Sequence, residues 1–119
     1  MPYNKRIEEK IEKIIRRWKN IEKKKMFGGI CYLMKGNMCF GIYKEFLIVR
    51  TGIEVAETKL KEKKVKPFDI TGRAMKGWVM VEEQGWKKEE DLENWLTLGK
   101  EYALTLPEKQ IGSGIRLEY

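Results

Sequence analysis

The stretch from Met26 to Tyr43, MFGGICYLMKGNMCFGIY, constrains the fold of this chain more than any other. It places a Gly-Asn pair, a signal for a tight turn, between two runs rich in aromatic and branched residues. We therefore predict strands at about residues 29–35 and 38–43, with the turn at Gly36-Asn37. A second reversal at Lys44-Glu45 leads into a third run, FLIVR, at residues 46–50. The sequence thus predicts a three-stranded antiparallel meander.

The turn positions also predict which face of the sheet each side chain occupies. With Gly36-Asn37 as the turn, Cys31 lies opposite Ile42, and Cys31 and Cys39 point to opposite faces. Helices are expected on the face with Cys31, Leu33, Met38, Phe40, Ile42, Leu47 and Val49. The other face is expected to carry Ile30, Tyr32, Met34, Cys39, Gly41, Tyr43, Phe46, Ile48 and Arg50.

This second face is apolar nearly throughout, whereas the back of a two-layer domain is usually polar. An exposed apolar patch of that size normally has a partner. We therefore predict that it contacts a second copy of the chain, because symmetric pairing is the commonest assembly, with a regulator protein as the second choice. The alternative is that the first helix, the tail or Trp86 covers it from within the domain. The residues expected to bind the partner are Tyr32, Met34, Tyr43, Phe46 and Ile48.

The rest of the chain alternates helical and extended patterns. Apolar residues from Ile7 to Ile21 recur at helical spacing after Asn4, a residue type that favours the N-cap, and predict an amphipathic helix over about residues 4–22. A second helix is expected at about 54–64, then a loop that opens with at most a short strand. A strand at about 77–83 and a final helix at about 88–106, which Pro107 ends, complete the series.

These elements predict one α+β domain over residues 5–107. We expect two layers, with an antiparallel sheet made of the three-strand meander plus one or two further strands, packed with about three helices. Residues 108–119 contain Gly-Ser-Gly and have no periodic pattern, so they are expected to form a flexible tail.

Charge is distributed unevenly along the chain, whose net charge is +7. Residues 1–25 carry ten Lys/Arg and four Glu, whereas residues 77–101 carry three Lys and seven acidic residues. Such segments either steer partners or form solvated helix faces. Glutamates interrupt the positive helix and no helix-turn-helix is recognisable, so we expect at most weak, non-specific, salt-sensitive binding to nucleic acid. The basic patch that would meet phosphates is Lys5, Arg6, Arg16, Arg17, Lys19, Lys23, Lys24 and Lys25.

The residue types needed for catalysis are scarce. The chain has no histidine, the commonest general base near neutral pH, and its one serine, Ser113, lies in the expected tail. Two cysteines without a C-x-x-C spacing support neither a redox pair nor a zinc site, and no phosphate-binding glycine loop is recognisable. We therefore predict a protein that is not an enzyme and that uses no metal or cofactor. The remaining polar candidates share one Pro/Gly-containing loop, where turn formation is the alternative explanation: Asp69, Thr71, Arg73 and Lys76.

The sequence also predicts where the protein resides. No run of about 18 apolar residues is present, and the N-terminal residues MPYNKRIEEK contain no apolar segment of the kind that signal peptides carry. Two cysteines without an export signal indicate a reducing compartment. We therefore expect a cytoplasmic protein with no membrane partner.

An ordered series of short motifs resembles the TfoX/Sxy amino-terminal domain. The series runs from about residue 15 to residue 107, nearly the whole chain, and its order and spacing are more specific than any single motif. It implies a two-layer α+β fold with helices against an antiparallel sheet. The motifs are Met26-Phe27-Gly28-Gly29, Gly36-Asn37-Met38, Gly41, Arg50, Pro67-Phe68, Gly72-Arg73, Met75-Lys76-Gly77-Trp78, Trp95, Tyr102-Ala103 and Leu106-Pro107.

The resemblance implies a regulatory role and brings no enzymatic activity. The family is linked to natural competence in bacteria, where TfoX/Sxy acts with the cyclic-AMP receptor protein at certain promoters. The longer regulators carry a second, carboxy-terminal domain, whereas about twelve residues follow Pro107 here. The expected function is thus a transcription-associated accessory protein that binds a protein partner, such as a transcription regulator or RNA polymerase. The alternative is a stand-alone, chaperone-like dimeric interaction module with no direct role in transcription.

Overall fold

The computed structural model of this chain describes residues 4–26, 28–69 and 75–108. Within these residues, six strands and four helices form an α+β fold, as the sequence predicted, with more strands than expected and one more helix. The elements in chain order are α1 (Lys5–Ile15), β1 (Ile21–Met26), β2 (Gly29–Met34), β3 (Asn37–Tyr43), β4 (Phe46–Arg50), α2 (Ile53–Lys59), β5 (Val65–Pro67), β6 (Trp78–Val81), α3 (Glu83–Trp86) and α4 (Glu89–Leu104).

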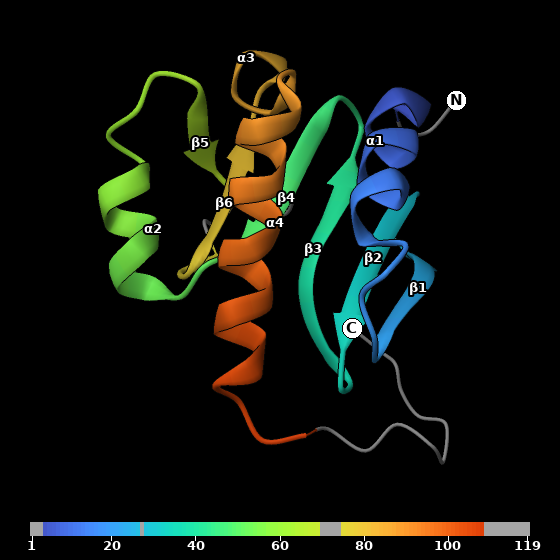
Figure 1. The fold of residues 1–119 in the computed structure, drawn as a ribbon. Helices are drawn as coiled ribbons and strands as arrows, with labels where there is room; N and C mark the ends of the chain where they lie inside the picture. The colour runs from blue at the N-terminus through green and yellow to red at the C-terminus, as the bar shows by residue number, and fades with distance from the viewer. Residues whose placement is uncertain (1–3, 27, 70–74, 109–119) are drawn as a thin grey trace.

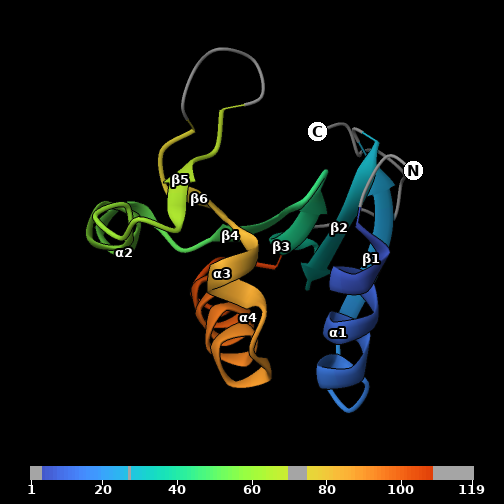
Figure 2. The ribbon, with the colours of Figure 1, turned by 90° about the horizontal axis from the view of Figure 1, so that it is seen from above.

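The strands form one antiparallel sheet in the order β1-β2-β3-β4-β6-β5. Figure 1 shows α4 running along the middle of the sheet, with α1 beside it over β2 and β3. The view from above in Figure 2 places both helices on the same side of the sheet, which we call the helix-covered face; the other side is the open face. Helix α2 lies beyond the edge of the sheet formed by β5 (Figure 2).

The first helix is shorter than its apolar period predicted. Asn4 does cap it, because its side-chain oxygen accepts a hydrogen bond from the backbone N–H of Arg6 at 2.8 Å. The helix ends at Ile15, and Asn20 then adopts a positive φ of 63° before β1 begins. The prediction of helix up to residue 22 was therefore wrong, because pairing with all of β2 holds residues 21–26 extended.

The first hairpin turns one residue earlier than predicted. Lys35 and Gly36 occupy the two central turn positions, with φ of 53° and 84°, and Met34 pairs with Asn37. A tight hairpin turn favours positive φ at both positions, and glycine meets that requirement at the second one. Asn37 instead begins β3. Because Leu33 pairs with Met38 instead of the predicted Phe40, the pairing beside the turn differs by two residues, which by itself leaves the predicted faces of β2 unchanged.

A bulge between Tyr32 and Leu33 shifts the pairing by one residue, which exchanges the faces of β2 relative to Phe40 and Ile42, so the predicted face assignment of β2 was wrong. Beyond it, Tyr32 pairs with Phe40 and Cys31 with Gly41. The second hairpin agrees with the prediction, since Lys44-Glu45 joins β3 to β4 and Ile42 pairs with Leu47. The hydrophobic core therefore contains the strand residues Ile30, Tyr32, Met34, Cys39, Phe40, Ile42, Leu47, Val49, Val65, Val79 and Val81.

The second half of the chain keeps the predicted order of elements with different bounds. The helix expected at 54–64 ends at Lys59, and Val65–Pro67 forms the short strand that the loop was expected to allow. Strand β6 ends at Val81, and the short helix α3, which was not predicted, follows it. The side chain of Asn37 donates to the carbonyl of Pro107 at 2.9 Å, which ties the end of the predicted domain to the β2–β3 hairpin. The remainder of the predicted tail, residues 109–119, lies outside the described residues.

Helix α4 lies unusually close to the sheet at Gly99. A Cβ atom built on Gly99 would lie 2.4 Å from the carbonyl oxygen of Cys39, a distance that real side chains do not tolerate. Leu92, Trp95 and Leu96 on the same face of the helix are buried. The glycine therefore allows the helix backbone to approach β3, which brings the end of α4 to the end of β4.

Candidate functional site

The structure divides the five predicted partner-binding residues between the two faces of the sheet. Tyr32 and Met34 are buried in the core on the helix-covered face, so their assignment to the open face was wrong. Tyr43 and Phe46 are half-buried on the open face, and Ile48, on the same face, is buried. The predicted set therefore does not form one surface.

The feature that best resembles a binding site lies at the end of β4, around Arg50. Arg50 pairs with Trp78 of β6, and its guanidinium carbon lies 5.5 Å from the centre of the Trp78 ring. The ring of Tyr102, from α4, lies at the same distance, also 5.5 Å. Two aromatic faces attract the cation electrostatically and hold it in place. Among the described residues, no carboxylate forms an ion pair with Arg50.

Two glycines allow these residues to meet. Gly52 has φ of 89°, and a Cβ atom there would lie 2.8 Å from the Tyr102 ring. Gly77, with φ of 86°, accepts hydrogen bonds through its carbonyl from the N–H groups of Thr51 and Gly52, at 2.9 and 3.1 Å. Both conformations favour glycine, because a side chain at positive φ is strained. The end of β4 is therefore fixed beside the start of β6, with the ring of Tyr102 against it.

Exposed apolar side chains adjoin this group. Ile53 is 54% exposed directly after Gly52, and Met75 is 44% exposed two residues before Gly77. The backbone N–H of Met75 donates to the carbonyl of Phe68 at 3.0 Å. Arg50, Ile53, Met75, Trp78 and Tyr102 together are called the Arg50 surface below.

An aromatic row continues from the Arg50 surface across the open face. Phe68 lies 5.6 Å from Trp78 and 6.4 Å from Tyr43, measured between ring centres. Phe68 is itself buried, whereas Trp78 and Tyr43 are half-buried. The row therefore joins Tyr43, at the end of β3, to the Arg50 surface through Phe68 and Trp78.

The predicted polar loop is described only at its two ends. Asp69 and Lys76 are exposed, and they form no ion pair with any described residue. Thr71 and Arg73 lie outside the residues that the structure describes. The described part of the loop therefore gives no catalytic arrangement to weigh against the turn interpretation.

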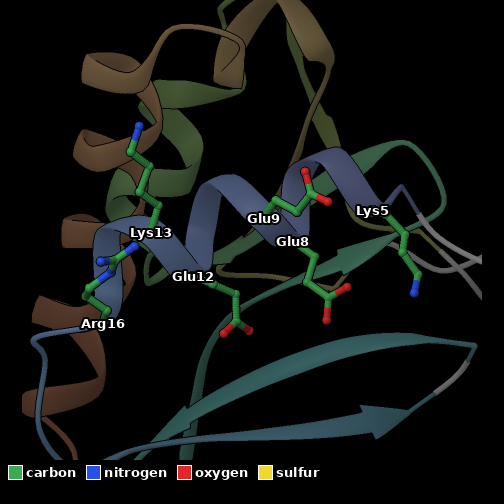
Figure 3. Close-up of a pocket in the computed structure, with 6 residues that line it drawn as sticks. All are labelled: Lys5, Glu8, Glu9, Glu12, Lys13 and Arg16. Atoms are coloured by element: carbon green, nitrogen blue, oxygen red, sulfur yellow. The ribbon is translucent and has the colours of Figure 1, made fainter.

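The predicted basic patch is interrupted by acidic side chains. Lys5 and Arg16 line a shallow pocket of about 700 Å³ on α1 together with Glu8, Glu9, Glu12 and Lys13. Figure 3 shows Glu8 and Glu12 pointing toward the strands and Lys13 pointing toward α4. The members that remain without an ion pair among the described residues are Lys5, Arg16, Arg17, Lys19, Lys24 and Lys25.

The uneven charge of the sequence is partly used inside the fold. Arg6 contacts Glu83 of α3 at 3.3 Å, and its guanidinium lies 6.0 Å from the centre of the Trp86 ring. Lys13 lies 3.9 Å from Glu89 at the start of α4. The basic N-terminal segment and the acidic later segment thus face each other within the chain.

Lys23 joins α1 to the first strand. Its amino group contacts the carboxylates of Glu8 and Glu12, the second at 2.8 Å, and Glu12 also accepts a hydrogen bond from the Tyr32 hydroxyl at 2.8 Å. Burial opposes ionisation of Glu12, but the hydrogen bonds from Lys23 and Tyr32 outweigh it and lower its pKa. Burial likewise opposes the charge of Lys23, and the two carboxylates outweigh it and raise its pKa. The network is a polar link between a helix and an edge strand.

The two thiols are free and buried. Burial raises the pKa of both Cys31 and Cys39 to about 12, so neither is ionised near neutral pH. In the described part of the chain, no cluster of three His, Cys, Asp or Glu side chains could hold a metal ion. These thiols therefore act as small core side chains.

Sequence reasoning named Arg50, Trp78 and Tyr102 only as separate motifs. A single signal was available, because an arginine that ends the apolar run FLIVR is followed at once by Thr51-Gly52. Nothing in the linear order brings α4 and β6 to the same point, so the group itself could not be foreseen.

Comparison with known proteins identifies one family. The family model for the TfoX N-terminal domain matches residues 13–103 of this chain. No curated protein and no solved structure matches the chain significantly. Within the described residues, every helix is too short or too polar to cross a membrane.

Proposed function

The chain belongs to the TfoX N-terminal domain family, and we propose that it works without catalysing a reaction, as an accessory protein that binds a protein partner in transcription. Such a partner is a transcription regulator or RNA polymerase, which would place the protein in the cytoplasm. We propose the Arg50 surface as the binding site.

The observation that carries this proposal is the composition of the Arg50 surface. Interfaces are enriched in arginine, methionine and aromatic residues, and the residues that dominate binding energy are most often Trp, Tyr and Arg. Here an arginine lies between a tryptophan and a tyrosine, beside two exposed apolar side chains. Because the two rings hold Arg50 in place, little conformational entropy would be lost when a partner binds.

The charge of Arg50 supports a polar contact at the centre of this surface. A guanidinium group has five N–H donors, and no described side chain or carbonyl accepts a hydrogen bond from Arg50. A carboxylate or carbonyl group of the partner would satisfy these donors, while Ile53 and Met75 would bury apolar area around it. This arrangement matches an interface with a polar centre fixed by aromatic residues.

Affinity capture from a lysate of the source organism tests the proposal. The tagged wild type is compared with the double variant Ile53→Glu/Met75→Glu, which changes exposed side chains and leaves the core intact. Leu104→Glu is the matched control, because Leu104 is an apolar side chain of similar exposure, 47%, at the end of α4. We expect polymerase or a DNA-binding regulator with the wild type and the control, and at least tenfold less with the double variant.

The same experiment separates this function from the alternatives. Equal recovery of such a partner by all three proteins would contradict the Arg50 surface as the site. Recovery of mixed unfolded chains instead would favour the stand-alone, chaperone-like module. Light scattering shows whether the partner is a second copy, because the mass would be twice 14.1 kDa for the wild type and 14.1 kDa for the double variant.

A further inference from the structure

The two edges of the sheet differ in length and chemistry. Strand β5 forms one edge with three residues, and Pro67 among them has no N–H to offer another strand. Strand β1 forms the other edge with six residues, no proline, and full pairing with β2 from Ile21 to Met26. No described strand pairs with its outer side. The edge at β1 is therefore long and regular enough to accept a further strand.

The charges around β1 have one dominant sign. Lys24 and Lys25 lie on the strand and alternate between the two faces of the sheet. Arg16, Arg17 and Lys19 lie in the connection that leads into it, and Lys35 is exposed at the hairpin beside it. None of these six has an ion pair among the described residues, and Glu22 is the one acidic residue of the strand.

The contacts of Lys23 distinguish it from the other two lysines of β1. Lys23 is engaged by Glu8 and Glu12 of α1, which holds the strand against the helix layer. Lys24 and Lys25 lie on either side of the outer edge and remain free to meet a ligand. A strand that is already fixed on one side loses little freedom when another strand pairs with it.

From these observations we infer that β1 is a docking edge for an acidic, extended segment of a partner protein, which adds to the sheet as a seventh strand. Backbone groups along β1 would supply the hydrogen bonds, and Lys24 and Lys25, on opposite faces of the sheet, would select acidic side chains at adjacent positions of the added strand. Lysines on an edge strand repel a second copy of the same edge, so they disfavour β1–β1 pairing. Nucleic acid would use the positive charges but leave the backbone edge unused. This site is separate from the Arg50 surface, whose strand residues lie in β4 and β6.

The probe for this inference is a blocked eight-residue peptide with four consecutive Glu between pairs of Thr, which presents carboxylates on both faces and is labelled for fluorescence anisotropy at low salt. A second peptide has the same sequence with N-methyl groups on two adjacent central amides. Adjacent amides of a strand point to opposite edges, so these two methyl groups obstruct both edges while the charge stays the same. We expect the first peptide to bind, the second to bind at least tenfold more weakly, and the first to slow hydrogen exchange of amides in β1.

Two charge-reversal variants locate the binding edge. Lys24→Glu/Lys25→Glu is expected to weaken binding of the first peptide at least tenfold. The matched control is Lys61→Glu/Lys63→Glu, which makes the same change of net charge at exposed positions near the β5 edge. We expect the control to remain within twofold of the wild type, apart from the general effect of net charge that raised salt removes.

Four results would overturn the inference. Equal binding of the methylated peptide would show that charge alone is recognised, and equal weakening by both variants would show that no particular edge is involved. If duplex DNA displaced the peptide and also bound the β1 variant more weakly than the wild type, the positive charges would be assigned to nucleic-acid binding. Protection of β1 amides that rises with protein concentration in the absence of peptide would make the occupant a second copy. Circular dichroism of each variant confirms that folding is unchanged before binding is compared.

Discussion

Helices α1 and α4 cover the same face of one sheet in different ways. Helix α4 approaches β3 through Gly99, with a row of buried apolar side chains and almost no space between the two backbones. Helix α1 buries three isoleucines, Ile7, Ile11 and Ile15, and adds a polar link on its other side, from Glu8 and Glu12 to Lys23. The contact of α4 with the sheet is apolar, whereas the contact of α1 combines an apolar stripe with a network of titratable side chains.

The two helix contacts position different parts of the molecule. Close apolar contact fixes α4, whose C-terminal end brings Tyr102 to Arg50, so the Arg50 surface inherits its geometry from the packing at Gly99. The polar link at α1 fixes an edge strand without covering it. The predictions below test how far each helix depends on apolar burial and how much the polar link contributes.

The largest expected effects are equal for the two helices. Ile11→Ala and Leu96→Ala each remove a fully buried side chain, and we expect each to lower the free energy of unfolding by about 3 kcal/mol, the range for such truncations. Leu104→Ala, at an exposed position, should change it by less than about 0.5 kcal/mol. Urea unfolding measures all three. A cost for Ile11→Ala below about 1 kcal/mol would mean that α1 is held mainly by its polar link.

A smaller loss of stability is expected at Gly99, where the backbones of α4 and β3 meet. Gly99→Ala places a methyl group against the carbonyl of Cys39, and we expect a loss of about 2 kcal/mol because overpacking costs more than the gain in helix propensity, about 1 kcal/mol. Glu93→Ala on the exposed face of the same helix is the control and should be neutral or slightly stabilising. If Gly99→Ala also proved stabilising in urea unfolding, the close approach of α4 and β3 would be wrong.

The polar link should contribute less than either apolar contact. Lys23→Met removes the cation that two carboxylates share, and we expect a loss of at most about 1 kcal/mol, since the side chains are partly exposed. The difference should shrink in 1 M salt because ions screen exposed pairs. Lys24→Met, which changes the neighbouring lysine, should have no salt-dependent effect. An equal loss for both variants would show that the ion pairs at Lys23 contribute nothing.

The smallest effect is the pH dependence of that link. The pKa of Glu12 is lowered from its ordinary 4.5, so its contribution is full above that value and disappears as the pH falls through the lowered folded-state pKa. For Lys23, whose pKa is raised from 10.5, the contribution is full below that value and disappears as the pH rises through the folded-state pKa. Glu12→Gln should thus be less stable than the wild type at pH 7 and equal to it in strong acid. A gap that persists in acid would assign the effect to shape instead of charge.

Much of this fold could be predicted because its signals are local. The reversal at Lys44-Glu45, the strand FLIVR and the cap at Asn4 each depend on a few neighbouring residues, and each was confirmed. The final helix was also recognisable, because its buried residues recur at helical spacing. The errors occurred where two local patterns competed. The isoleucine period continued past Ile15 into residues that pair with β2, and Gly36 suited either of two adjacent turns.

The candidate site was predictable only in part. The apolar character of the open face is visible in the strand sequences, but a one-residue shift of pairing at the bulge between Tyr32 and Leu33 placed Tyr32 and Met34 in the core. Because successive side chains alternate between faces, such a shift exchanges every side chain of a strand. The assignment of Tyr43 was unaffected, since it depends on the second turn.

By itself, the sequence determined that this protein is an α+β domain built on an antiparallel meander, and its ordered motifs indicated the TfoX N-terminal domain family, which comparison then showed. These properties follow from periodicity, turn chemistry and motif spacing, which operate over short distances along the chain. The tertiary structure alone decided the register of β2, the strand identity of residues 21–26 and the meeting of Arg50 with Trp78 and Tyr102. Each of these depends on contacts between residues far apart in sequence, where the free energy of packing outweighs the local preference.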